Sequence, residues 1–202
     1  DGANLPSVSS LPRLGVGDPM ELLSPHEGEV ILDLGSGPGR DVLLAAERVG
    51  PRGRAIGVDS TPEMVFRARE AAASLGRPSA EFRLGEIEHL PIETESVDGI
   101  TSDCVINLST DKAQVFREAF RVLKPGGRIV VSDVVADGEL PAWVRQDAER
   151  WAACEAGAVN AADYVALMRS AGFEAVEAVL KGAYREGLSR ATVRGRKPAR
   201  RG

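Results

Sequence analysis

Residues 33–39 read Asp-Leu-Gly-Ser-Gly-Pro-Gly, and this stretch decides the fold class. A short apolar run, residues 29–32, precedes it, and a helix-like segment begins near Arg40. A strand, a glycine loop and a helix in this order suit a nucleotide-like ligand, because glycines let the backbone approach the ligand and the helix N-terminus offers unpaired N–H groups. The stretch therefore predicts an α/β protein with such a site.

The spacing of the glycines separates this loop from the dinucleotide-binding type. That fingerprint needs a third glycine two residues beyond the second, and Arg40 occupies the position. Here Gly35, Gly37 and Gly39 alternate behind Asp33 instead. This form resembles motif I of class I S-adenosylmethionine-dependent methyltransferases.

A second carboxylate follows at the expected distance. Residues 54–59 read Arg-Ala-Ile-Gly-Val-Asp and predict a strand that ends in Asp59, twenty residues after Gly39. An acidic residue there is placed to accept hydrogen bonds from both ribose hydroxyls. Asp59 also suits the cap of a helix beginning near Pro62. Both roles are compatible, because Ser60 or Thr61 can cap the helix while Asp59 faces the ligand.

The composition is that of an ordinary globular protein. The chain has 202 residues, of which 43% are hydrophobic and 27% charged, which fits one α/β domain. No apolar run approaches the length of a membrane span. The first ten residues lack the basic-then-apolar pattern of a signal peptide. We therefore expect a cytoplasmic protein without a membrane partner.

Charge is unevenly distributed along the chain. The net charge is −5, yet residues 181–202 carry eight Lys or Arg against one acidic residue. A basic tail can bind nucleic acid, but the rest of the chain is acidic, which argues against a DNA or RNA substrate. We interpret the basic segment as a solvated final strand and expect no nucleic-acid partner.

Strand and helix signals alternate after the glycine loop, which predicts a doubly wound, mostly parallel sheet. The expected strands are residues 29–34, 54–58, 80–84, 97–102, 127–133, 173–180 and 188–195. The expected helices are residues 40–49, 62–75, 111–123, 141–153 and 161–171. Residues 181–187 are too few for a crossover helix, so the last two strands should form an antiparallel hairpin. Residues 1–19 look like an irregular arm before a domain of residues 20–202.

Seven strands with a terminal hairpin resemble the Rossmann-like fold of class I S-adenosylmethionine methyltransferases. The resemblance implies cofactor contacts beyond Asp33, the three glycines and Asp59. Glu86 and Ile87 stand where such enzymes present a carboxylate and an apolar edge to adenine, and Met64 is placed to pack on the adenine face. Glu86 also fits a solvated loop and Met64 a core position. Further implied contacts are Ser60 and Asp103.

Three further segments resemble one branch of these enzymes, the arsenite S-adenosylmethionine methyltransferase family. They are Ser-Asp-Cys-Val-Ile-Asn-Leu at residues 102–108, the stretch from Asp111 through the Leu-Lys-Pro-Gly-Gly turn at 123–127, and Cys-Glu-Ala-Gly-Ala at 154–158. The turn is common to methyltransferases in general, whereas the two cysteine segments are specific. The resemblance covers residues 14–198.

The resemblance assigns the two cysteines a function. Cys104 and Cys154 are fifty residues apart, and on sequence alone two such cysteines fit buried small hydrophobic residues. In the arsenite family, thiolates hold trivalent arsenic, a soft centre that prefers sulfur ligands. The resemblance thus implies an arsenic(III) site at Cys104 and Cys154, S-adenosylmethionine as cofactor, a trivalent arsenical as substrate, and a thiol reductant such as glutathione or thioredoxin. The two histidines, His26 and His89, are expected at the surface.

The chain departs from the family at two positions. Family members usually carry a cysteine where this chain has Val16, and another where it has Val42. Inorganic arsenite offers three coordination positions, whereas monomethylarsenite has one already filled by carbon. A two-thiol site therefore favours monomethylarsenite as the substrate, or needs a third ligand such as glutathione.

Two other functions remain open at this point. A methyltransferase for a small quinone- or sterol-type acceptor would have an apolar acceptor pocket and incidental cysteines. A protein that binds the cofactor without catalysis would show no turnover. A dehydrogenase disagrees with both the glycine spacing and the terminal hairpin.

Overall fold

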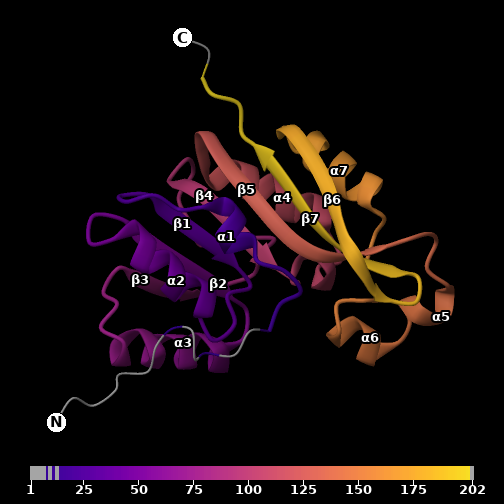
Figure 1. The fold of residues 1–202 in the computed structure, drawn as a ribbon, viewed down its shortest axis with the longest axis horizontal. Coiled ribbons are helices and arrows are strands. Elements are labelled where there is room, and N and C mark those ends of the chain that lie inside the picture. The colour runs from indigo at the N-terminus through magenta and orange to yellow at the C-terminus, as the bar shows by residue number, and fades with distance from the viewer. Residues whose placement is uncertain (1–7, 9–10, 12–13, 201–202) are drawn as a thin grey trace.

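The computed structural model describes residues 8, 11 and 14–200. Seven strands form one sheet in the order β3-β2-β1-β4-β5-β7-β6 (Figure 1). They are β1 (Val30–Leu34), β2 (Arg54–Asp59), β3 (Ala80–Leu84), β4 (Val97–Asp103), β5 (Leu123–Ala136), β6 (Glu174–Arg185) and β7 (Leu188–Arg196). The first five run parallel, and β7 is antiparallel to both β5 and β6. The predicted doubly wound sheet with its terminal hairpin is confirmed.

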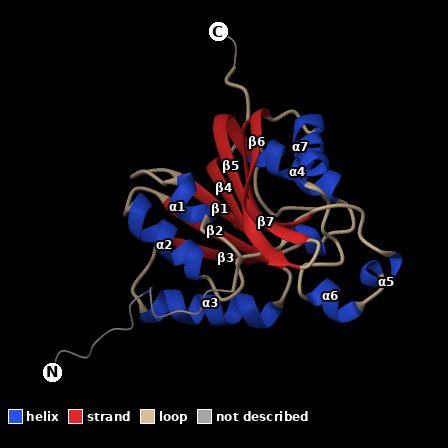
Figure 2. Ribbon diagram, turned by 45° about the vertical axis from the view of Figure 1, so that its right-hand side comes forward, coloured by secondary structure: helices blue, strands red, loops and turns tan. Residues whose placement is uncertain are grey.

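Helices cover both faces of the sheet (Figure 2). They are α1 (Pro19–Leu23), α2 (Arg40–Val49), α3 (Pro62–Ser74), η2 (Ile106–Leu108, a 3-10 turn), α4 (Lys112–Val122), α5 (Ala142–Arg145), α6 (Ala148–Ala152) and α7 (Ala161–Ser170). Helices α1, α2 and α3 pack on one face and α4 and α7 on the other. Successive residues of β1 serve the two layers in turn, since Ile31 packs with α1 and α2 while Leu32 and Leu34 face α4.

The strand order reverses next to β1, which is flanked by β2 and β4. In open α/β sheets, ligands bind outside the carboxyl ends of the strands at such a reversal. The three strand ends bring together the glycine loop after β1, Asp59 at the end of β2, and Asp103 and Cys104 at the end of β4. Residues predicted from separate motifs therefore meet at one edge.

The predicted helix over residues 141–153 is wrong. The segment forms two short helices, α5 and α6, because Asp147 accepts hydrogen bonds from the N–H groups of Glu149 and Arg150 and starts a new helix. Trp143 remains 60% exposed. The apolar residues of this stretch therefore do not mark one continuous buried face.

The two strands of the terminal hairpin are longer than predicted from the sequence. The connection predicted at residues 181–187 is mostly strand: β6 continues to Arg185, and only Glu186 and Gly187 separate it from β7. Gly187 has φ +73, a value that glycine adopts without steric cost. Strand β5 also begins earlier than predicted, at Leu123, and its register against β4 shifts between Val97 and Gly99.

Most of the predicted arm at residues 1–19 lies outside the described residues. Its described end leads into α1, where Asp18 caps the helix by accepting from the N–H of Glu21. Within residues 14–200, no helix has the length and apolar character that a membrane crossing requires.

Candidate active site at the carboxyl edge of the sheet

All three glycines of the glycine loop have positive φ, Gly39 among them at +90. Gly35 has φ +67, and a Cβ there would lie 2.4 Å from the Val105 side chain, so no other residue fits. Gly37 has φ +51, and a Cβ there would meet no protein atom within 4 Å. The loop therefore packs tightly on one side and opens to free space on the other.

Asp59 fastens this loop from the neighbouring strand. Its Oδ2 accepts a hydrogen bond from the N–H of Gly37 at 2.8 Å, and its Oδ1 accepts from the N–H of Thr61 at 2.9 Å. Thr61 is the N-cap residue of α3 but makes no side-chain capping bond. Asp59 thus shapes both the loop and the entry to α3, and its carboxylate also lines the cavity beside them.

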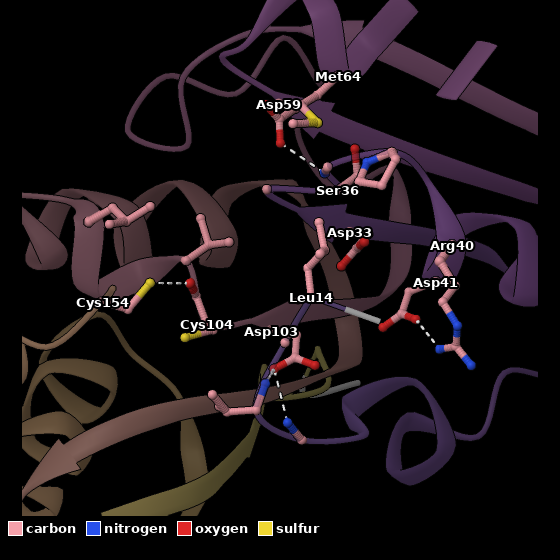
Figure 3. A pocket seen from close by; sticks show the side chains of 18 of the residues that line it. Leu14, Asp33, Ser36, Arg40, Asp41, Asp59, Met64, Asp103, Cys104 and Cys154 are labelled. Atoms are coloured by element: carbon pink, nitrogen blue, oxygen red, sulfur yellow. Dashed lines mark hydrogen bonds and ion pairs between the residues drawn. The ribbon is translucent and has the colours of Figure 1, made fainter. Parts of the chain in front are cut away.

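A cavity of about 980 Å³ occupies this edge of the sheet. Figure 3 shows Asp59 and Met64 at one end, Asp33 and Asp103 in the middle, and Cys104 with Cys154 at the other end. Its acidic wall comprises five aspartates against two arginines: Asp18, Asp33, Asp41, Asp59 and Asp103, with Arg40 and Arg190. Such a surface favours a ligand with positive charge.

Asp33 is the most deeply buried of these carboxylates, at 5% exposure, and accepts from the Thr101 hydroxyl at 2.9 Å. Burial raises the pKa of Asp33 well above its usual value, and the charges of Asp41, Asp103 and Asp59 raise it further. A cation in the cavity would counter this repulsion and favour the ionised carboxylate.

Asp103 holds the described end of the arm against the cavity. Its Oδ1 accepts from the N–H groups of Val16 at 2.8 Å and Gly17 at 3.1 Å. A Cβ at Gly15 would lie 1.9 Å from the Asp103 carboxyl group, and one at Gly17 would lie 2.3 Å from the Ser132 hydroxyl. Glycine is therefore required on both sides of Val16 for the arm to form this wall.

The two cysteines lie together and are not joined by a disulfide. The Cys154 thiol donates to the Cys104 carbonyl oxygen at 2.7 Å (Figure 3). Both residues have left-handed backbone conformations, with φ +59 at Cys104 and φ +62 at Cys154. Such values cost energy for non-glycine residues and are concentrated at functional sites. The side-chain interaction with Cys154, together with burial, raises the pKa of the Cys104 thiol.

The terminal hairpin also reaches the cavity, through Tyr184 of β6 and Arg190 of β7. The Arg190 guanidinium stacks on the Tyr184 ring, 5.3 Å from its centroid. The interpretation of the basic C-terminal segment as solvated is wrong for Arg190 and Lys197. Lys197 is 9% exposed and donates to the carbonyl oxygens of Phe120 and Leu123. The interpretation holds for the other described basic residues of this segment, which are exposed: Lys181, Arg185, Arg194, Arg196 and Arg200.

Four of the predicted cofactor residues do not line the cavity: Gly39, Ser60, Glu86 and Ile87. Gly39 is needed for packing, because a Cβ there would lie 2.7 Å from the Phe82 ring. Ser60 and Glu86 are exposed, and Ile87 belongs to the core against α4. The prediction that Glu86 and Ile87 contact adenine stays a prediction. Both histidines are exposed, as expected.

Val16 and Val42, which occupy the family's other two cysteine positions, lie in different parts of the structure. Val16 lines the cavity and packs, like Cys104, against the cluster formed by Val134, Leu140 and neighbouring residues. Val42 is 1% exposed and packs in the core beneath α2, away from the cavity wall. Only Val16 is therefore placed to affect a ligand held at Cys104.

Comparisons with known proteins agree with this geometry. A family profile described as a methyltransferase domain matches residues 25–175. The chain is 45% identical to an arsenite methyltransferase of Halobacterium salinarum, over 99% of this chain and 53% of that protein. It is 34% identical, with a TM-score of 0.79, to the crystal structure of an arsenic (III) S-adenosylmethionine methyltransferase from Chlamydomonas reinhardtii, over 95% of this chain and 71% of that one.

The chain belongs to the arsenic(III) S-adenosylmethionine methyltransferase family. Enzymes of this family use S-adenosylmethionine as the methyl donor. A demethylmenaquinone methyltransferase of Listeria monocytogenes is also similar, at 31% identity over 61% of this chain. The chain spans about half the length of the curated arsenite methyltransferases that it matches.

Several cavity residues of this methyltransferase domain were not predicted. Asp41 and Arg40 begin α2 and form an ion pair at 3.2 Å, and their place directly after the glycine loop was an available signal. Tyr184 and Arg190 carried no such signal, because only the hairpin pairing brings them to the cavity. Asn107, which contacts the Cys154 segment, lay within a recognised motif but was given no role.

The buried carboxylate of Asp133 gives stability a defined pH dependence. Burial raises the pKa of Asp133 to about 7, although hydrogen bonds from Val134, Tyr164 and Asn107 oppose the rise. A carboxyl group with a raised pKa in the folded state stabilises the fold at low pH, and this contribution is lost as pH rises through that pKa.

We therefore expect the wild type to lose unfolding free energy relative to Asp133→Asn, by about 3 kcal/mol between about pH 5 and pH 8. Urea denaturation of both proteins across this range measures the difference. A difference that grows in favour of the wild type with rising pH would contradict the assignment.

Proposed function

We propose that this methyltransferase domain transfers a methyl group from S-adenosylmethionine to trivalent arsenic held by Cys104 and Cys154. The observation that carries the proposal is the position of the paired cysteines in the same cavity as the glycine loop and Asp59. Donor and acceptor would then share one enclosed site, as a direct transfer requires.

The cavity suits the charge of this cofactor. S-adenosylmethionine carries a sulfonium and an ammonium group, and the aspartate-rich wall offers complementary charge. The free space beside Gly37 would admit the methionine part of the cofactor next to Gly35, and Asp59, which lines the same cavity, would accept hydrogen bonds from the ribose. Arg40, which lines the cavity and pairs with Asp41, would supply a cation for the cofactor's own carboxylate. When bound, the cofactor supplies an electrophilic methyl group.

Arsenic binding needs no preformed thiolate. Monomethylarsenite in water carries two hydroxyl groups, and each thiol replaces one of them, forming an As–S bond while the thiol proton leaves with the hydroxyl as water. Neutral thiols can make this exchange, so it is compatible with the raised pKa of the Cys104 thiol. Softness favours sulfur over oxygen ligands on trivalent arsenic.

The pair would hold arsenic with its lone pair directed at the donor. In the transfer an As–C bond forms, the C–S bond of the donor breaks, and its electron pair stays on the sulfur. The lone pair is consumed, so arsenic becomes formally pentavalent. A thiol reductant such as glutathione or thioredoxin must then return two electrons before the trivalent product is restored.

Two thiols favour a substrate with two exchangeable positions. Within residues 14–200, no cluster of three or more His, Cys, Asp or Glu is arranged to hold a metal ion. Val16 gives the wall near Cys104 an apolar surface. The third hydroxyl of inorganic arsenite would lose its hydration there, at a cost of about 1–3 kcal/mol. Monomethylarsenite presents a methyl group instead, so we propose that it is the preferred substrate.

Incubation with S-adenosylmethionine, glutathione and either arsenical, followed by chromatographic arsenic speciation, tests this function. We expect dimethylated product from monomethylarsenite at a rate roughly 5- to 150-fold above methylation of arsenite. Equal rates would contradict the preference, and no arsenic product with either substrate would contradict the function.

Val16→Cys is expected to reduce the difference between the methylation rates of monomethylarsenite and arsenite, because it offers arsenite a third sulfur at the cavity wall. This rate difference is called the gap below. Val42→Cys is the matched control: it makes the same substitution in the core beneath α2 and should leave the gap unchanged. The measurement is the ratio of the two methylation rates in each variant. A gap that narrows equally in both variants would refute the role of Val16.

A further inference from the structure

Asn107 connects the segment that carries Cys104 with the segment that carries Cys154. It lies in η2, three residues after Cys104, and is fully buried. Its side-chain amide nitrogen donates toward three acceptors: the carbonyl oxygen of Cys154 at 3.1 Å, that of Val134 at 2.7 Å, and Oδ1 of Asp133 at 2.9 Å. The segment that carries Cys104 thereby holds the backbone of Cys154.

The orientation of this amide is fixed by its surroundings. The Val134 and Cys154 carbonyl oxygens beside this nitrogen can only accept hydrogen bonds, so a flipped amide would place oxygen against oxygen. Asp133 secures it, because this buried carboxylate also accepts from the Asn107 backbone N–H at 3.2 Å and the Tyr164 hydroxyl at 3.2 Å. Hydrogen bonds to Asp133 and Val134 therefore fix the Asn107 side chain against the end of β5.

The segment that carries Cys154 packs closely against Asn107. A Cβ at Gly157 would lie 2.0 Å from the Asn107 carbonyl oxygen, so only glycine permits the approach. In return, the Cys154 thiol donates to the Cys104 carbonyl oxygen. Two hydrogen bonds, one in each direction, thus join the 104–107 segment to Cys154.

The other polar contacts of this segment point elsewhere. Glu155, which follows α6, is fully buried and pairs with Arg150 of α6 at 3.2 Å and with Arg185 of the hairpin at 2.8 Å. These ion pairs join Glu155 to α6 and to the hairpin, and neither partner lies in the segment that carries Cys104. The bond to Asn107 acts directly on the Cys154 backbone, which has the strained φ of +62.

We propose that Asn107 is a positioning residue that holds Cys154 at the distance from Cys104 at which one arsenic atom bridges both thiols. The proposal rests on the proposed function of the cysteine pair. Without the Asn107 amide, the Cys154 carbonyl loses its buried donor, and the thiols no longer converge before arsenic binds. The cost appears in arsenical binding and leaves cofactor binding unchanged, because Asn107 does not line the cavity.

Phenylarsine oxide, a trivalent arsenical with two exchangeable positions, is a suitable probe. We expect Asn107→Ala to weaken its binding about 10-fold or more, with the affinity for S-adenosylmethionine within about 2-fold of wild type. Tyr164→Phe is the matched control, since it also removes one donor to Asp133, whereas the Tyr164 hydroxyl donates to Asp133 and not to the Cys154 carbonyl. It should bind phenylarsine oxide within about 2-fold of wild type.

A second measurement separates positioning from general destabilisation. The equilibrium between the dithiol and the Cys104–Cys154 disulfide in glutathione buffers gives the effective concentration of the two thiols, which should fall about 10-fold or more in Asn107→Ala. If the alanine variant does not fold, Asn107→Ser is measured in its place, with the same expectation of weaker arsenical binding and lower effective concentration.

The outcomes distinguish the two proposals. Wild-type binding of phenylarsine oxide that requires both cysteines, together with unchanged binding in the folded Asn107 variant, would overturn the positioning role alone. Equal losses in Asn107→Ala and Tyr164→Phe would also overturn it. Wild-type binding that survives replacement of both cysteines would overturn the proposed function, and this inference with it.

Discussion

Cys104→Ser and Cys154→Ser are each expected to lower the rate of methyl transfer to monomethylarsenite by on the order of 100-fold or more. One remaining thiol holds arsenic through a single bond, so arsenic can rotate about that bond and its lone pair is no longer directed at the donor. The measurement is arsenic speciation with saturating S-adenosylmethionine. Affinity for the cofactor, measured by calorimetry, should stay within about 2-fold of wild type.

Ser132→Ala provides a control for local disturbance. Ser132 lies on β5 beside the end of β4, where its backbone carbonyl accepts from the Cys104 N–H at 2.8 Å, and its hydroxyl has no hydrogen-bond partner among the described residues. The substitution should leave methyl transfer nearly unchanged. Arsenic methylation that survives both cysteine replacements would reject the arsenic site at Cys104 and Cys154.

Asp59→Ala should have the second large effect, on cofactor affinity. In the proposed cofactor site this carboxylate accepts hydrogen bonds from the ribose hydroxyls. It also accepts from the Gly37 N–H and so maintains the shape of the glycine loop. Hydrogen bonds to a charged group contribute about 1.5–3 kcal/mol each, which corresponds to roughly 10- to 150-fold weaker binding of S-adenosylmethionine by calorimetry.

Glu63→Ala is the matched control for charge. Glu63 lies in the first turn of α3, is exposed, and does not line the cavity. It should bind the cofactor within about 2-fold of wild type, since an exposed charge outside the site has little effect. Unchanged affinity in Asp59→Ala, or an equal loss in Glu63→Ala, would reject the placement of the ribose at Asp59.

The parts of the fold that were predicted depend on local patterns. The carboxylates that end strands and the alternating glycines form motifs only a few residues long, so the sequence alone reveals them. The strand order follows from short crossover connections, which are right-handed. These rules suffice to bring Asp59, Asp103 and Cys104 to one edge. The strand over 80–84 and the helix over 40–49 have the predicted bounds. Alternating apolar and charged residues mark the strand, and apolar residues at helical spacing mark the helix.

The parts that were missed depend on contacts between distant segments. The break between α5 and α6 needed the capping by Asp147, and the presence of Tyr184 and Arg190 in the cavity needed the register of the hairpin. Gly39 belongs to the same motif as Gly35 and Gly37, yet the Phe82 ring of β3 fills the space where a side chain at Gly39 would lie. A motif thus identifies the loop, whereas tertiary packing decides which of its residues meet the ligand.

X-ray absorption spectroscopy at the arsenic edge, on the wild-type protein with one equivalent of monomethylarsenite, tests the arsenic site most directly. We predict two As–S bonds and one As–C bond per arsenic atom, with one of the As–S bonds lost in Cys104→Ser and likewise in Cys154→Ser. Arsenic bound through oxygen, or a spectrum unchanged by either replacement, would contradict a site shared by Cys104 and Cys154.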